Sequence, residues 1–468
     1  MTKSILPQDQ TCRNSIAAFL VATLLILPAA TNAQKASDPP PPDHPLTLGD
    51  CIALALQESP AVDASRFDVA AAGEEVRAAQ GEALPNLTGS AAAQLFEGSP
   101  TGKFSVVDFG QSGGAGVSST RVAGLTGVEV YSAHLRYPLF KDGSILGLNN
   151  PPAIASKEAK KRNLAWTTRL RREEVIDRIR DAYITTVSAL NRAGYAERRV
   201  TLLEQVVGIT AEQQKQGLML PIDLKVARGQ LSGARSLAKI LREQAVAGTI
   251  EMSRALGFDS PSELHLSSEL PEPPEPPSAE KLLGPSLEQH PSLQVQRAVI
   301  DQAKEDYRLE RFRLYPSVSL DGSVIYIDDF GSSNSAVYSG AVTVNVPIFD
   351  FGTQLATARA KLMKYKSERA KLLSVADDVT FQVVKTYEEI YILSQNILSL
   401  QEEVSKADRD LQVVGSQQQQ GIAPPLTAIE KELHLIAKRD DLDGLQMRRL
   451  VLYSALQKAA GGSWKWDQ

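Results

Sequence analysis

Apolar and polar residues alternate along the stretch 337–352. The apolar positions are Tyr338, Val342, Val344 and Val346, and the polar ones are Ser339, Thr343 and Asn345. A period of two is typical of a β-strand with one face buried and the other in water. The stretch 131–143 has the same alternation, and both stretches continue into Pro-apolar-Phe and then a long helical pattern. We therefore predict two related strands, each at the head of a long helix.

Two further stretches have a strand pattern, at 85–96 and 317–326. In the second, Val318, Leu320 and Val324 alternate with Ser319, Asp321 and Ser323. Each stretch follows a helical pattern that ends at a proline, Pro85 or Pro316. The chain is thus expected to contribute four strands, in two pairs.

Helical periodicity covers most of the remaining chain. Long helices are predicted over 156–216 and 354–420. Their apolar stripes include Tyr183 and Leu190 in the first helix and Val379, Val383 and Ile390 in the second. At about 1.5 Å per residue, each would be roughly 90–100 Å long, which exceeds any compact core. Shorter helices are predicted at 46–83, 222–256, 286–314 and 426–459. Laid end to end in pairs, these would match one long helix each, which predicts an α-helical cylinder or coiled-coil bundle.

The landmarks recur in the same order, which indicates two tandem structural repeats. Pro60 precedes Pro85 by 25 residues, and Pro291 precedes Pro316 by 25. The repeats are assigned to 46–270 and 281–460, separated by a Pro-rich linker at 271–280 and followed by a C-terminal tail at 461–468. Coincidence of prolines in a helical protein is the alternative, and the shared order of several landmarks argues against it.

The N-terminus has the pattern of a secretory signal peptide over residues 1–33. Lys3 and Arg13 precede an apolar run at 16–30, which is shorter than the roughly twenty residues needed to span a membrane. A Pro-rich leader follows at 34–45. After cleavage Cys51 would be the only thiol, so no internal disulfide is expected.

Charge and residue chemistry exclude several classes of function. The net charge of −5 and the pI of about 5.7 give no basic footprint for nucleic acid. The five histidines have no metal-ligand spacing, and neither a phosphate-binding loop nor a nucleophile elbow is present. We therefore expect neither an enzyme nor a metal or cofactor site.

The four strands pose a physical problem. Their alternation suits a membrane barrel with a water-filled lumen, but four strands cannot close, and an open edge in lipid leaves backbone groups unpaired. Either several chains share one barrel, or the strands form small periplasmic hairpins on a coiled coil. The strand pattern alone leaves these alternatives open.

Several motifs together resemble the outer membrane efflux protein family, the TolC-like channels. They are LTLGDCIALALQESPAV, ALPNLTGS, the paired YPLF and VPIFDFG, and the turns QKQGLMLPID and QQQQGIAPPL. The resemblance spans about residues 46–460. It implies a homotrimer with four strands per chain in a twelve-stranded outer-membrane β-barrel and a long-helix periplasmic α-barrel. It also implies contact with outer-membrane lipid, a periplasmic adaptor (membrane fusion) protein and an inner-membrane transporter.

The resemblance places a periplasmic aperture at the two turns, Gly217 to Pro221 and Gly421 to Pro425. Of the family's acidic aperture positions only Glu430 keeps its charge, since the other is Thr427. Asp223 matches an aspartate that helps hold the channel shut, but its partners' positions are Gln418 and Ala423. Ordinary readings of both acids stay open: Glu430 as a solvated helix charge, and Asp223 as a helix cap.

The leading hypothesis is a passive outer-membrane exit duct for a tripartite efflux pump or type I secretion system. A soluble periplasmic coiled-coil adaptor or scaffold is the alternative. Fractionation separates the two hypotheses. A trimer that only detergent extracts from the membrane would favour the duct, and a protein found in the soluble fraction would favour the scaffold.

Overall fold

A computed structural model describes residues 45–96, 126–258, 264–267, 273–329 and 333–466. All of them belong to one unit, Pro42–Gln468. The predicted signal peptide, most of the Pro-rich leader and residues 97–125 lie outside the described residues.

Helices make up most of the described chain. In order they are α2 (Leu48–Glu58), α3 (Pro60–Glu82), α4 (Pro152–Lys215), α5 (Pro221–Ala255), α6 (Ala279–Gln289), α7 (Pro291–Phe312), α8 (Thr353–Gln419) and α9 (Pro425–Ala459). The order of a helix pair, a strand pair, a long helix and a return helix occurs twice. Duplication as the origin of this order stays a prediction.

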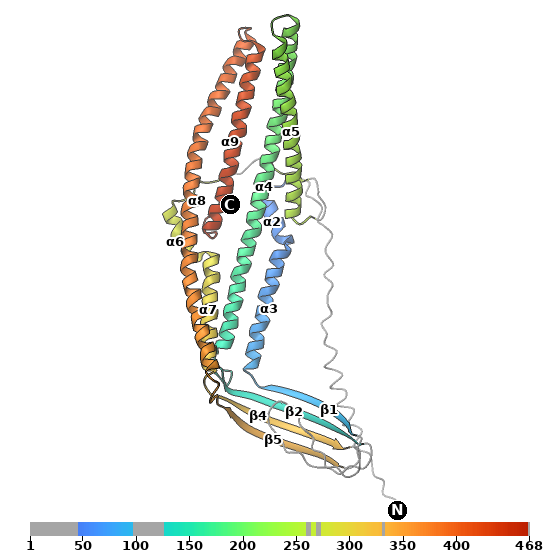
Figure 1. Ribbon diagram of the computed structural model, residues 1–468, viewed down its shortest axis with the longest axis vertical. Helices are drawn as coiled ribbons and strands as arrows, with labels where there is room; N and C mark the ends of the chain where they lie inside the picture. The colour runs from blue at the N-terminus through green and yellow to red at the C-terminus, as the bar shows by residue number, and fades with distance from the viewer. Residues whose placement is uncertain (1–44, 97–125, 259–263, 268–272, 330–332, 467–468) are drawn as a thin grey trace, which may run out of the picture. The chain divides into compact units, whose positions relative to one another are not determined.

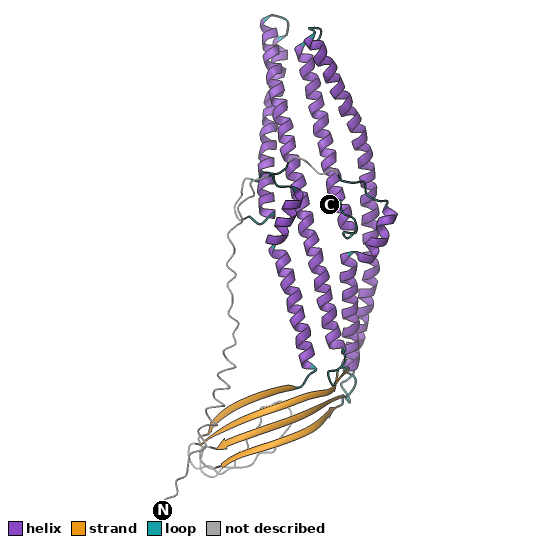
Figure 2. Ribbon diagram, turned by 180° about the vertical axis from the view of Figure 1, so that it is seen from behind, coloured by secondary structure: helices purple, strands orange, loops and turns teal. Residues whose placement is uncertain are grey.

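The helices run lengthwise beside one another (Figures 1 and 2). α4 contacts α3 and α5 on one side, and α7 and α9 on the other; α8 contacts α7 and α9. The unit therefore has four helical tracks, in the order α3 with α5, then α4, then α7 with α9, then α8. The prediction that pairs of shorter helices run beside each long helix is confirmed.

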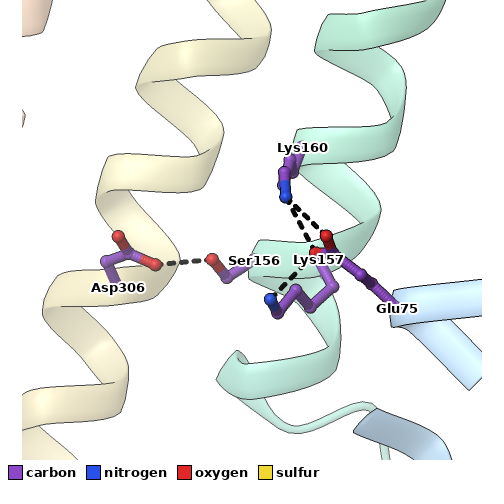
Figure 3. Close-up of polar contacts among 5 residues, drawn as sticks. All are labelled: Glu75, Ser156, Lys157, Lys160 and Asp306. Atoms are coloured by element: carbon purple, nitrogen blue, oxygen red, sulfur yellow. Dashed lines mark hydrogen bonds and ion pairs between the residues drawn. The ribbon is translucent and has the colours of Figure 1, made fainter. Parts of the chain in front are cut away.

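Polar contacts join three of the tracks near the sheet (Figure 3). The carboxylate of Glu75 on α3 accepts hydrogen bonds from Lys160 Nζ at 2.7 Å and from Lys157 Nζ at 3.0 Å, both on α4. These two lysines lower the pKa of Glu75. On the other side of α4, Ser156 Oγ donates to Asp306 Oδ1 of α7 at 2.5 Å. Each contact joins neighbouring tracks, so it supports their order.

The main apolar core lies midway along the tracks. Tyr183 and Val187 of α4 and Val383 of α8 are buried there, with Cys51 of α2 and Met252 of α5. The hydroxyl of Tyr183 donates to the carbonyl of Ser267 at 3.2 Å. The core thus forms where the shorter helices of each track meet.

The strands form one antiparallel sheet at one end of the helices (Figure 1). They are β1 (Asn86–Phe96), β2 (Thr126–Lys141), β4 (Ser317–Asp329) and β5 (Ser333–Asn345), in the spatial order β1-β2-β4-β5, with the short β3 (Ser144–Ile145) paired to β2. This is also the order of the tracks to which the strands connect. Sheet and helices therefore share the same two outer edges, β1 with α3 and β5 with α8.

Some predicted bounds were wrong. The helix expected over 286–314 is two helices, because His290 before Pro291 has ψ of 125°, outside the helical range. The strand expected to include Val346 ends at Asn345, before Pro347. The linker expected at 271–280 overlaps α6, which begins at Ala279.

Two side chains also differ from expectation. Leu190, placed on the buried stripe of α4, is 40% exposed. Trp466, in the segment expected to be a tail, is only 3% exposed and packs into the main core. The segment that ends at Trp466 is therefore packed against the main core.

Candidate functional site

The sheet has one predominantly apolar face. Paired residues on neighbouring strands point to the same face, and the register aligns Ala133 with Val324 and Val324 with Tyr338. Leu87 lies opposite Leu135 on the same face. The exposed fractions of Leu87 and Tyr338 are 72% and 75%, so this face has no cover within the described chain.

The opposite face is predominantly polar and internally hydrogen-bonded. Ser90 and Ser132 join their hydroxyls at 2.7 Å across β1 and β2. Arg136 Nε of β2 donates to Asp321 Oδ1 of β4 at 2.7 Å. Apolar residues interrupt this face beside Ser132; they include Val130, Ile325, Ile327 and Val337. The charges of the Arg136–Asp321 pair offset one another, which leaves a face dominated by neutral hydroxyl and amide groups.

The two outer strands, β1 and β5, each pair with a single strand in the part of the chain that the structure describes. Their outer N–H and C=O groups form free edges, which bind further strands readily. An apolar face together with two free edges is incompatible with an isolated sheet in water.

The two predicted turns lie together at the end of the helices far from the sheet (Figures 1 and 2). They have the same hydrogen-bond pattern. Gly217 N donates to Gln214 O at 3.0 Å and Leu218 N to Gln213 O at 2.9 Å; Gly421 N donates to Gln418 O at 3.0 Å and Ile422 N to Gln417 O at 2.8 Å. Both are Schellman caps with glycine in the left-handed region, φ +73° and +71°.

A proline follows each turn glycine by four residues and starts the return helix. Pro221 is the first residue of α5 and Pro425 the first of α9, where a missing N–H costs no helical hydrogen bond. The residues after the glycines, Leu218 and Ile422, are 73% and 69% exposed. Both turns thus present an apolar side chain at the far end of the tracks.

Asp223 acts as a helix cap. Its Oδ2 accepts the backbone N–H of Leu220 at 3.0 Å, at the start of α5. Acidic groups stabilise this end of a helix because its free N–H groups carry partial positive charge. The same carboxylate is exposed. The alternative reading of Asp223 as a cap therefore has direct geometric support.

Glu430 lies in α9 and is exposed. Its neighbour Ile429 is buried against Leu202 of α4. Among the described residues, no hydrogen bond or ion pair involves the Glu430 carboxylate. This acid is thus free to interact with solvent ions.

The turn glycines lead to a first prediction. Gly217→Ala and Gly421→Ala should each cost about 1–2 kcal/mol locally, because an alanine resists positive φ. No atom would obstruct the added methyl group. Amide hydrogen exchange at Leu218 and Ile422 should accelerate. Gly229→Ala, inside α5 and equally unobstructed, is the control and should leave exchange at the turns unchanged.

Two parts of this site were not predicted. The Arg136–Asp321 pair joins residues 185 positions apart, and only the strand register brings them together. The exposure of Leu218 and Ile422 also depends on where the turns lie. The apolar–polar alternation of the two predicted strands did place Arg136 and Asp321 at polar positions. This is the one feature of the sequence that could have indicated the pair.

Of the described helices, none has the length and apolarity required to cross a membrane. Groups of three or more His, Cys, Asp or Glu side chains in a metal-binding arrangement are absent from the described residues.

Four tracks of long helices, continued by a two-faced antiparallel sheet, form a TolC-like fold. Solved structures share this fold. The outer membrane protein VceC from Vibrio cholerae superposes with a TM-score of 0.70 at 17% identity, over 89% of this chain and 97% of VceC. The CmeC outer membrane channel of Campylobacter jejuni gives 0.70 at 13% identity, over 90% of this chain and 87% of CmeC.

The sequence also matches known proteins. Residues 282–462 match the model of the outer membrane efflux protein family. The pyoverdine export outer membrane protein OpmQ of Pseudomonas aeruginosa is 20% identical over 307 residues. That alignment covers 62% of this chain and 62% of OpmQ, so it spans less than two thirds of the relative's length. Residues 282–462 thus carry an outer membrane efflux protein domain, and the described chain shares the fold of solved outer membrane channels.

Proposed function

We propose that the chain is one subunit of a homotrimeric exit duct, through which an efflux pump or type I secretion system exports its substrate. The observation that carries this proposal is the sheet, which has an apolar face, a polar face and two free edges. Lipid can cover the apolar face and water the polar one, and neighbouring copies can pair the free edges. In a trimer the four strands per chain would become a twelve-stranded barrel.

The helical edges support the same assembly. α8 exposes Val384, Tyr391 and Leu398, spaced by seven residues, as in a coiled-coil contact. At the opposite edge, α3 exposes Phe67 and α5 exposes Ile240. The apolar surface of one copy would thus meet that of the next. Such a head-to-tail contact closes into a ring when the rotation permits.

The duct is passive in this proposal, so the energy for transport comes from partners. A periplasmic adaptor would dock at the helix ends, and an inner-membrane transporter would supply the substrate. The turns Gly217 to Pro221 and Gly421 to Pro425, with Asp223 and Glu430 beside them, would form the aperture. Residues 1–33 would direct export as a signal peptide, and 46–270 and 281–460 would form the two repeats.

Membrane fractionation and planar-bilayer recording test the proposal together. We expect the full-length protein in the outer-membrane fraction, detergent to extract it as a trimer, and the purified trimer to conduct ions. A protein released by salt washing and inactive in bilayers would instead be the soluble scaffold.

Glu430→Gln tests the aperture. A unit charge about 4 Å from an ion in water contributes about 1 kcal/mol, so cation preference should fall roughly fivefold. Reversal potentials under a KCl gradient measure this preference. Glu402→Gln, which removes an exposed acid of α8 away from the turns, should leave it unchanged. If the wild type and Glu430→Gln have the same cation selectivity, Glu430 is an ordinary surface charge.

A further inference from the structure

A small pocket lies at the end of α7, next to the sheet. It has a volume of about 180 Å³ and is lined by Arg308, Arg311, Phe312 and Tyr315. The two aromatic rings are 6.0 Å apart, inclined by 45°. Guanidinium groups and aromatic walls therefore occur in one concave site.

The two guanidinium groups differ in their surroundings. Arg308 Nη1 contacts the carboxylate of Glu305 at 3.0 Å. Arg311 forms neither an ion pair nor a hydrogen bond with another described residue. It lies in the last turn of α7, where the helix dipole stabilises a cation. Arg311 thus has its donors available for an anion.

The position of the pocket identifies the environment of that anion. Tyr315 is two residues before β4, and the apolar face of the sheet begins there with Val318 and its partner Val344. The four junctions between helices and strands all expose apolar side chains at this level; they include Leu84, Leu148, Tyr315, Ile348, Phe349 and Phe351. Exposed fractions of 91% for Ile348 and Phe351 are high for soluble surfaces. This apolar collar is typical of residues at a membrane–water boundary.

We propose that the pocket binds the phosphate of a phospholipid headgroup from the leaflet that faces the helices. Arginine matches phosphate oxygens with paired N–H donors. The rings of Phe312 and Tyr315 would contact the glycerol and the first acyl carbons. The site goes beyond conduction, because it anchors the duct at a fixed depth rather than handling substrate.

Native mass spectrometry of the detergent-purified full-length trimer tests the proposal. The probes are phosphatidylethanolamine, phosphatidylglycerol, and diacylglycerol, which lacks phosphate. We expect both phospholipids to bind the wild type, and diacylglycerol to bind at least tenfold more weakly. Arg308→Gln/Arg311→Gln should weaken phospholipid binding about tenfold. The control variant Lys304→Gln/Arg359→Gln removes two exposed cations outside the pocket. It should bind phospholipid as tightly as the wild type does.

Two results would overturn the site. One is equal phospholipid binding by the wild type and the pocket variant. The other is displacement of the lipid by millimolar inorganic phosphate, which would indicate a site for soluble phosphate. Trimer content and single-channel conductance of the pocket variant should match wild type, so failure of the lipid site is distinguishable from failure of the duct.

Discussion

Leu398→Arg is expected to abolish the trimer. Leu398 belongs to the apolar stripe of α8 and is 56% exposed in the single chain. In the proposed ring this stripe packs against the α3 and α5 track of the next copy, so each contact would bury an unpaired guanidinium. An uncompensated buried charge costs about 3–5 kcal/mol, and a three-subunit ring contains three such contacts. Seminative electrophoresis and light scattering of the detergent-solubilised protein should show monomers.

The matched control is Leu190→Arg. Leu190 is also an exposed leucine on a long helix, at 40%, but α4 has neighbouring tracks on both sides within the chain. We expect this variant to remain trimeric. A trimer of Leu398→Arg with wild-type thermal stability would show that the α8 stripe is not the contact between subunits.

The second large effect is expected at the C-terminus. Trp466→Ala should lower stability by about 3–5 kcal/mol, the usual cost of truncating a buried aromatic side chain. Trp466 packs into the main core, and the guanidinium carbon of Arg180 lies 5.9 Å from its ring centroid. Because Arg180 is itself only 2% exposed, the variant would also remove a neighbour of a buried cation. The thermal midpoint of the detergent-solubilised protein should drop by several degrees.

Trp464→Ala controls for loss of any tryptophan from this segment. Trp464 is partly buried and lies 5.5 Å from Tyr453, centroid to centroid. A smaller drop is expected, because less apolar surface leaves the core. The variants are compared at one heating rate, because such proteins can unfold irreversibly. If the thermal midpoint of Trp466→Ala equals that of the wild type, Trp466 contributes nothing to the stability of the core.

The spacing of apolar residues was sufficient to predict the helices and strands in which that spacing is regular. The stripe through Val379, Val383 and Ile390 predicted the buried side of α8, and these residues are buried. Gly and Pro mark the two turns in the sequence, because only a few residue types suit a left-handed cap and a first helical position. Strand existence followed from alternation, and all four predicted strands are present.

Features that depend on partners distant in sequence were not predictable. Trp466 lies in a Gly-rich, unpatterned segment, and its burial requires the core around Tyr183 to exist first. Leu190 continues the apolar spacing of α4, yet no neighbouring helix covers it. The pocket of Arg308 and Arg311 arises only where α7 ends beside the sheet. In each case tertiary placement, rather than local propensity, determines the outcome.

The shared order of strands and tracks has a consequence for how the proposed ring is built. Because β1 continues from α3 and β5 continues into α8, closing the sheet and closing the helical cylinder are one geometric event. A dimer of two joined subunits would still have an unpaired edge at each end, both in the sheet and in the helical part. We therefore expect assembly to be all-or-none, with folded monomers and complete rings but no long-lived dimers.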